Sequence, residues 1–119
     1  MAQEALGDYP EALASFKAAR ERVPENADIV VNEATIHYYL GDYAQALALL
    51  EEAEVLAPEE ANIYNLRGMI AFEQEAYGEA LKEVERAIQL NSDQPYFYNN
   101  RGLYRLFTGE LRRGFRILI

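Results

Sequence analysis

The side chains best suited to chemistry in this chain are few and widely spaced. His37 is the only histidine, and Glu33 precedes it by four residues, so the two would share one face of a helix. A catalytic metal needs about three protein ligands, and a triad needs a nucleophile beside a positioned base. The chain has no cysteine and no glycine-rich phosphate loop. We therefore expect no enzyme activity, no catalytic or metal-binding residues and no cofactor.

Charge is distributed unevenly along the 119 residues. The net charge is −9, but residues 1–94 carry 19 acidic and 6 basic side chains, whereas residues 95–119 carry Glu110 and five arginines. A long acidic surface repels phosphate backbones, so we expect no nucleic acid partner. No apolar run approaches the roughly 20 residues needed to cross a bilayer, and the N-terminal residues lack a signal pattern. The sequence as given predicts a soluble, cytoplasmic chain that does not bind a membrane.

An internal repeat determines which elements must position any binding residues. The octet LGDYPEAL at 6–13 returns as LGDYAQAL at 40–47 and, with changes, as QEAYGEAL at 74–81, each step being 34 residues. A fixed period of this length is typical of proteins built from stacked, like units. The fold is therefore predicted from the repeat before any single residue is considered.

Each unit is predicted to be a pair of helices. Apolar residues recur on more than one face of residues 27–40, as expected of a helix packed on both sides. Gly41 permits the left-handed conformation that ends a helix, and Asp42 can accept from the first amides of the next one. A second helix is expected over residues 43–56, and Pro58 terminates it because proline cannot continue the hydrogen-bond ladder.

The same punctuation is expected in the other units. Gly7-Asp8 and Gly109-Glu110 lie in the register of Gly41-Asp42, and Glu75-Ala76 is the one departure. Pro95 is expected to open the first helix of the last unit, because the first helical turn tolerates proline.

These residues make the chain similar to the tetratricopeptide repeat family. In that family a Gly-x-Tyr opens the second helix, and a small residue, a bulky apolar residue, an alanine and a proline follow. The matching residues here are Gly7, Tyr9, Ala12, Phe16, Ala19 and Pro24; Gly41, Tyr43, Ala46, Leu50, Ala53 and Pro58; and Glu75, Tyr77, Ala80, Val84, Ala87 and Ser92. Ala34, Gly68 and Gly102 match the close-packing position of the first helix.

The resemblance implies an all-α fold, a right-handed superhelical stack of antiparallel helix pairs with about seven to eight helices. We expect one domain over residues 1–119. It would contain a partial repeat at 1–26, complete repeats at 27–60 and 61–94, and a partial repeat at 95–119.

The resemblance also implies a protein-protein interaction module that binds a peptide or helical segment in a concave groove lined by the first helices. The groove positions would be Asp28, Val31, Asn32, Thr35, Tyr38, Tyr39, Asn62, Asn65, Leu66, Met69, Phe72, Tyr96, Asn99, Asn100 and Leu103. Asparagine can both donate to and accept from a peptide backbone, and Tyr, Phe and Met offer apolar contact. The alternative for each aromatic residue is a place in the core between helices.

One function known in the family can be compared position by position. Members that capture chaperone tails hold the tail carboxylates with basic residues and asparagines of the first helices. The corresponding positions here are Val31, Thr35, Leu66, Tyr96 and Asn100, none of which is basic. The sequence therefore predicts that this chain has no such clamp.

The C-terminal residues are apolar where a repeat array usually carries a polar cap. Phe115, Ile117, Leu118 and Ile119 form this end. Either the chain is a fragment of a longer array that covers the end, or the end is buried by another copy or by a dedicated partner, with the basic last unit meeting an acidic surface. Of these we hypothesise weak self-association through this end. The alternative to a binding module is accordingly a structural spacer or self-association segment of a larger repeat protein.

Overall fold

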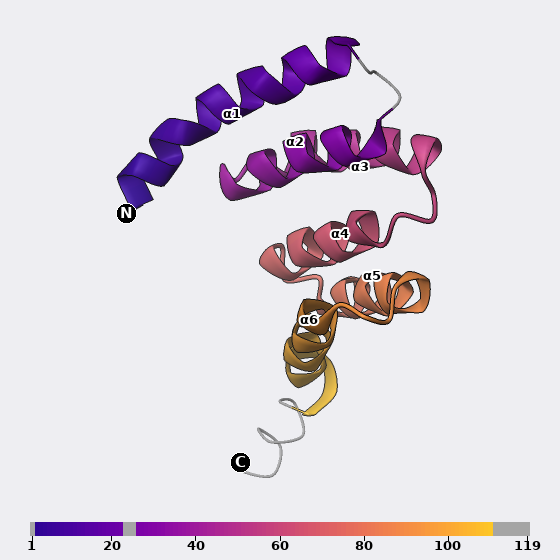
Figure 1. Ribbon diagram of the computed structural model, residues 1–119. Coiled ribbons are helices and arrows are strands. Elements are labelled where there is room, and N and C mark those ends of the chain that lie inside the picture. The colour runs from indigo at the N-terminus through magenta and orange to yellow at the C-terminus, as the bar shows by residue number, and fades with distance from the viewer. Residues whose placement is uncertain (1, 23–25, 111–119) are drawn as a thin grey trace. The chain divides into compact units, whose positions relative to one another are not determined.

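The computed structural model describes residues 2–22 and 26–110, with side chains for residues 9–22 and 26–109, and this part of the chain is helical without strands. Figure 1 shows the helices in chain order. They are α1 (Ala2–Arg22), α2 (Ala27–Tyr39), α3 (Tyr43–Leu56), α4 (Ala61–Glu73), α5 (Tyr77–Leu90) and α6 (Pro95–Arg105), followed by the π-helical turn η1 (Leu106–Glu110). The chain divides into two compact units, residues 1–59 and 60–119. The division falls at the end of the repeat predicted for residues 27–60.

The first unit is built on the pair α2 and α3, onto which α1 packs through α2. Gly41 has a φ of +79°, and the Asp42 carboxylate accepts from the backbone amide of Gln45 at 3.3 Å, so the turn predicted at these two residues is confirmed. Apolar residues of both helices are fully buried between them: Val30, Ala34, Ala46, Leu50 and Ala53.

The second unit repeats this pair with α4 and α5 and adds α6. A Cβ atom placed on Gly68 would lie 3.1 Å from the carbonyl oxygen of Ala80, so the close approach of two helices predicted at this glycine is confirmed. The core of the unit contains Ile63, Tyr64, Ile70, Val84, Ala87, Phe97 and Tyr104. The helices α2, α4 and α6 begin at Ala27, Ala61 and Pro95, the predicted starts of the repeats.

The helix count differs from the predicted seven to eight, because six α-helices are present in the described ranges. The turn expected at Gly7-Asp8 is absent, since α1 runs through it and contains Pro10 in its interior.

The turn expected at Gly109-Glu110 is also different. These two residues end the π-helical turn η1, and Gly109 does not have the positive φ of Gly41. The shortened helix expected after them, over residues 111–119, lies outside the described residues. Across the described ranges, no helix combines the length and apolar character needed to span a membrane.

Candidate functional site

Two first helices of the second unit, α4 and α6, present a polar and apolar surface that we call the α4/α6 face. Residues at helical spacing on each helix form it: Asn62 and Met69 of α4, and Tyr96, Asn99, Asn100 and Leu103 of α6. The Tyr96 hydroxyl donates to Asn62 Oδ1 at 2.6 Å, across exactly one repeat of 34 residues. This bond ties the beginnings of the two helices together.

A second hydrogen-bonded pair lies one turn further along. Asn100 Nδ2 donates to Asn65 Oδ1 at 3.0 Å, and Asn65 Nδ2 reaches the Met69 sulfur at 3.5 Å. Asn65 is only 5% exposed, so its amide is a satisfied buried group that links α4 to α6. Asn100 is half-buried. Three of the five asparagines predicted for a groove, Asn62, Asn65 and Asn100, thus take part in two hydrogen-bonded links between α4 and α6, the two rungs of this face.

The apolar side chains of the α4/α6 face are accessible. Tyr96 is 43% exposed and Leu103 40%, whereas Leu66, also predicted for the groove, is 4% exposed and packs in the core. Burial, and after it the negative charge of Glu60, raise the pKa of Tyr96. The Glu60 carboxylate caps α4 by accepting from the amide of Asn62 at 3.3 Å.

Phe72, the remaining predicted groove residue of this unit, belongs to an aromatic cluster. Its ring centroid lies 5.4 Å from Tyr77, 5.2 Å from Tyr104 and 5.1 Å from Phe107. These distances are typical of packed aromatic pairs. Phe72 therefore connects α4 with α5, α6 and η1. It has the place between helices that was the alternative to a groove position for each aromatic residue.

The predicted groove residues of the first unit all lie on α2, with different exposure. Asp28, Asn32 and Tyr39 are exposed, Thr35 and Tyr38 are half-buried, and Val31 is 8% exposed. The Thr35 hydroxyl donates to its own helix at the Val31 carbonyl, 2.9 Å away. Tyr39 stacks on Tyr9 of α1 with ring centroids 6.0 Å apart and meets Tyr38 edge-on at 5.2 Å. The accessible part of α2 is therefore Asp28, Asn32 and Tyr39.

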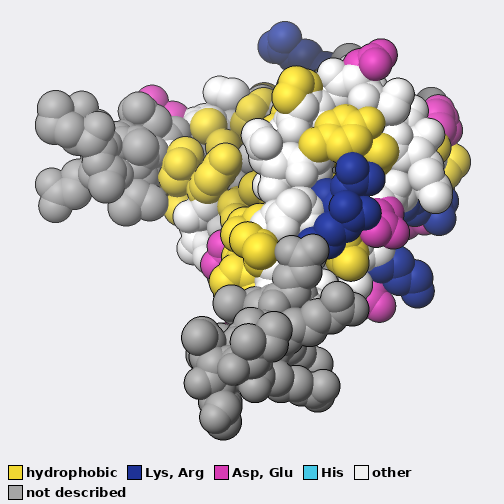
Figure 2. Space-filling model, turned by 90° about the horizontal axis from the view of Figure 1, so that it is seen from below, with side chains coloured by type: hydrophobic (Ala, Val, Ile, Leu, Met, Phe, Trp, Pro, Cys, Tyr) yellow, Lys and Arg dark blue, Asp and Glu magenta, His cyan; other side chains and the backbone are white. Residues whose placement is uncertain are grey.

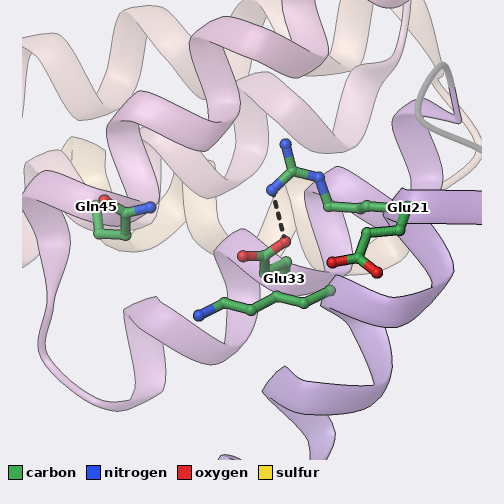
Figure 3. Close-up of a pocket in the computed structure, with 5 residues that line it drawn as sticks. Glu21, Glu33 and Gln45 are labelled. Atoms are coloured by element: carbon green, nitrogen blue, oxygen red, sulfur yellow. Dashed lines mark hydrogen bonds and ion pairs between the residues drawn. The ribbon is translucent and has the colours of Figure 1, made fainter.

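A group of charged residues around Glu33 is a second place where functional chemistry could gather. Glu33 is 1% exposed, and its Oε1 accepts from Arg20 Nη1 of α1 at 3.0 Å (Figure 3). Arg20 also donates to Glu52 of α3. A cavity of about 380 Å³ lies beside them and is lined by Lys17, Arg20, Glu21, Glu33 and Gln45. Burial lowers the pKa of Arg20, but hydrogen bonds to Glu33 and Glu52 outweigh it and leave the pKa raised.

The contacts of Glu33 assign it a structural role. Its Oε2 lies 4.0 Å from His37 Nε2, so the predicted pair of His37 and Glu33 is close but Arg20 is the nearer partner. Sequence reasoning missed Arg20. The sequence did hold a signal for a basic partner, because the position of Glu33 carries an arginine in the next two repeats, Arg67 and Arg101. In the described part of the chain, no three His, Asp or Glu residues are grouped so as to hold a metal ion.

Among the described residues, none packs on the side of α6 that bears Gly102. Tyr98 is 38% and Leu106 47% exposed, while their counterparts 34 residues earlier, Tyr64 and Phe72, are buried or half-buried against α5. Among the described residues, nothing lies within 4 Å of a Cβ placed on Gly102. Arg101 lies over the Tyr98 ring at 5.0 Å. Figure 2 shows surface hydrophobic side chains beside Lys and Arg. Phe115, Ile117, Leu118 and Ile119, predicted for self-association, lie outside the described residues.

Helix pairs repeating every 34 residues, with a left-handed turn inside each pair and a close-packing small residue in each first helix, define a class of helical repeat proteins. Within that class, the sequence model of the tetratricopeptide repeat matches residues 1–38 and 31–95. The chain belongs to the tetratricopeptide repeat (TPR) family. Its fold is all-α, as predicted from the repeat.

Solved structures share this fold. The first TPR of Spaghetti (RPAP3), bound to the HSP90 peptide SRMEEVD, is 24% identical with a TM-score of 0.73, over 82% of this chain and 78% of that one. The first TPR domain of human RPAP3 is 22% identical with a TM-score of 0.79, over 90% and 84%. The Sgt2 TPR domain from Aspergillus fumigatus is 20% identical with a TM-score of 0.80, over 94% and 76%. No curated protein matches the sequence.

Proposed function

We propose that this chain is a protein-protein interaction module that holds a peptide or helical segment of a partner on the exposed faces of its first helices. The observation that carries the proposal is the α4/α6 face, where two hydrogen-bonded rungs fix amide groups between accessible apolar side chains. The family supports the proposal, since one of its structures holds a peptide. No catalytic step is part of it.

The chemistry of the α4/α6 face suits a peptide backbone. Both hydrogen-bonded pairs use the Oδ1 atom of an α4 asparagine as acceptor, so Asn62 Nδ2 can donate to a ligand and Asn100 Oδ1 can accept from one. A peptide group presents one donor and one acceptor and can meet both. Tyr96 and Leu103 supply apolar contact on either side. On the first unit, Asp28, Asn32 and Tyr39 are the corresponding accessible residues.

The experiment uses the two exposed asparagines of the α4/α6 face. Asn62→Ala combined with Asn99→Ala removes amides without opening the core, whereas Asn65→Ala would remove a buried side chain and leave the half-buried Asn100 amide without its acceptor. We expect the double variant to bind the partner recovered with the wild-type chain at least tenfold more weakly, while its melting temperature falls by only a few degrees because one exposed hydrogen bond, from Tyr96 to Asn62, is lost. Gln74→Ala with Gln89→Ala, at exposed positions outside this face, is the control. Equal affinity of both double variants would refute the proposal.

An acidic chaperone tail is not the partner we propose. The structurally similar first TPR of Spaghetti is bound to the peptide SRMEEVD. In this chain no basic residue stands at the positions that would clamp such a tail, which are Val31, Thr35, Leu66, Tyr96 and Asn100. Glu60 adds negative charge beside Tyr96. We expect titration calorimetry with the peptide SRMEEVD to show no binding at micromolar concentration. Micromolar affinity would overturn this part of the proposal.

Self-association is a second candidate function, and the side of α6 that no described residue covers favours it. The occupant we propose is α1 of a second copy. Ala12, Phe16 and Ala19 of α1 stand where α3 and α5 have fully buried residues, yet they are only half-buried. Because α1 is a second helix of the repeat and α6 a first helix, packing them across two copies would complete a repeat. The basic last unit would then meet an otherwise acidic chain, as the charge distribution of the sequence allows.

A further inference from the structure

A cavity of about 360 Å³ lies beside α1 in the first unit, and we call it the α1 cavity. Four residues of α1 and one at the beginning of α2 line it: Ser15, Ala18, Ala19, Arg22 and Ile29. Each of them stands two repeats before a residue of α5 or α6, and these equivalents are Glu83, Arg86, Ala87, Leu90 and Phe97. The second unit therefore shows which side chain the repeat places at this position.

In the second unit, an aromatic ring from α4 packs at this position. Tyr64 is 2% exposed, Arg86 lies over its ring at 4.5 Å from the centroid, and Arg86 Nη2 donates to the Tyr64 hydroxyl at 3.5 Å. The residue of α1 equivalent to Arg86 is Ala18, which is exposed. Among the described residues, no aromatic side chain lines the α1 cavity.

Tyr98 of α6 is the equivalent of Tyr64 one repeat later, and its ring is accessible. It is 38% exposed, and its hydroxyl donates to the Ser92 carbonyl oxygen at 2.9 Å. Arg101 of the same helix lies over the ring at 5.0 Å. The chain therefore carries an exposed aromatic side chain of the type that the second unit buries, as well as a cavity at the position that receives it.

The pair α4 and α5 gives the register in which such helices pack. A Cβ atom placed on Gly68 would lie 3.1 Å from the Ala80 carbonyl oxygen and 3.5 Å from the Glu83 Cβ atom. Tyr64, one turn before Gly68, meets Arg86, so residue numbers fall along α4 as they rise along α5. The two helices are antiparallel.

The same register between two copies of the chain brings complementary residues together. Tyr98 of one copy would lie against Ala18 of the other, and Gly102, which is exposed, would allow the helices to approach closely. One turn further, Arg105 of α6 would approach Glu11 of α1, and both are exposed. Opposite charges at this end favour the same alignment.

From this correspondence we propose that the α1 cavity accepts the ring of Tyr98 from a second copy of the chain. Tyr98 and Ala18 are then the pair that makes the packing of α6 on α1 selective. This inference rests on the proposed self-association and specifies the side chains on which it depends. An aromatic ring that fills a cavity carries much of the binding energy of an interface, because it buries a large apolar area.

The test measures self-association of the whole chain by sedimentation velocity over a range of concentrations. Tyr98→Ala removes the ring and Ala18→Tyr fills the cavity, each at an exposed position, so the fold is retained. We expect each variant to weaken association about tenfold or more. Tyr98→Phe is the matched control: it loses the bond to Ser92 but keeps the ring, and it should associate like the wild-type chain.

The two substitutions combined in one chain give the decisive measurement. Tyr98→Ala with Ala18→Tyr returns an aromatic ring to the contact from the opposite helix, so association should recover to within about threefold of the wild-type value, whereas independent effects would add. Failure to recover, or single variants that associate like Tyr98→Phe, would overturn the pairing and leave self-association standing. A wild-type chain that stays monomeric at every concentration would refute self-association and this inference with it.

Discussion

At the scale of single residues, the buried carboxylate of Glu33 shows how a charge is retained inside a small helical unit. It lies among apolar residues of α2, and its cost of burial is offset by Arg20 of α1, which also reaches Glu52 of α3. One guanidinium therefore connects three helices. Such a pair fixes geometry more than it adds stability, and its loss is costly because one charge stays buried without its partner.

The two carboxylates that share Arg20 allow a matched prediction. Glu33→Gln should lower the free energy of unfolding by about 1–3 kcal/mol, because the buried charge-assisted bond becomes a weaker neutral one and leaves the Arg20 charge partly uncompensated. Glu52→Gln should cost less than about 1 kcal/mol, since the Glu52 side chain is 43% exposed and water screens its interaction. Urea denaturation of both variants measures the difference. A larger loss for Glu52→Gln would contradict the role assigned to Glu33.

At the scale of elements, the turn between the two helices of a repeat is kept even where its glycine is not. Glu75 occupies the place of Gly41 and adopts the same left-handed conformation, with a φ of +62° against +79°. A residue with a Cβ atom pays roughly 1–2 kcal/mol in this region. The packing of α4 on α5, including the close approach at Gly68, holds the turn against that cost.

Exchanging the residues at these equivalent turns should change stability in opposite directions. We expect Glu75→Gly to raise the free energy of unfolding by about 0.5–1 kcal/mol, because glycine adopts a positive φ without steric cost. Gly41→Ala should lower it by about 1 kcal/mol for the converse reason. Thermal and urea denaturation of the two variants measure these shifts. If Glu75→Gly were destabilising, an interaction of the Glu75 side chain would have to outweigh its backbone strain.

The elements also show what the sequence could predict. The starts of α2, α4 and α6 and the end of α3 before Pro58 were predicted correctly, because turns, caps and prolines act locally and repeat. The continuity of α1 through Gly7-Asp8 was not, because whether a turn forms there depends on helices packing on both sides. The burial of individual side chains could not be predicted either. Asn62 and Asn65 are the same residue type on the same helix, but only Asn65 is buried under α6.

At the scale of the whole molecule, two different surfaces could meet between copies of this chain. One is the side of α6 that no described residue covers, and the other is the half-covered side of α1. Such a contact is heterologous, so each copy keeps one surface free, and assembly continues unless the geometry closes a ring. In α4 and α5 the corresponding contact brings Gly68 against Glu83, whose Cβ lies 3.5 Å from the position of an added Cβ. The equivalent residues across two copies are Gly102 and Ser15, both exposed.

This geometry predicts the outcome of mixing two variants that are each blocked at one surface. Gly102→Trp should block α6 and Ser15→Trp should block α1, while each substitution adds a side chain only at an exposed position. Gly102→Ala should assemble like the wild-type chain, because Ala34 fills the same place in α2 at full burial.

In sedimentation velocity the wild-type chain should form concentration-dependent oligomers. Each tryptophan variant should be monomeric alone, and an equal mixture should give a dimer and nothing larger, since it leaves one intact pair of surfaces. A wild-type chain that stays monomeric at high concentration in both low and high salt would refute self-association. Loss of thermal stability in Gly102→Trp would indicate that the chain covers this side of α6 itself.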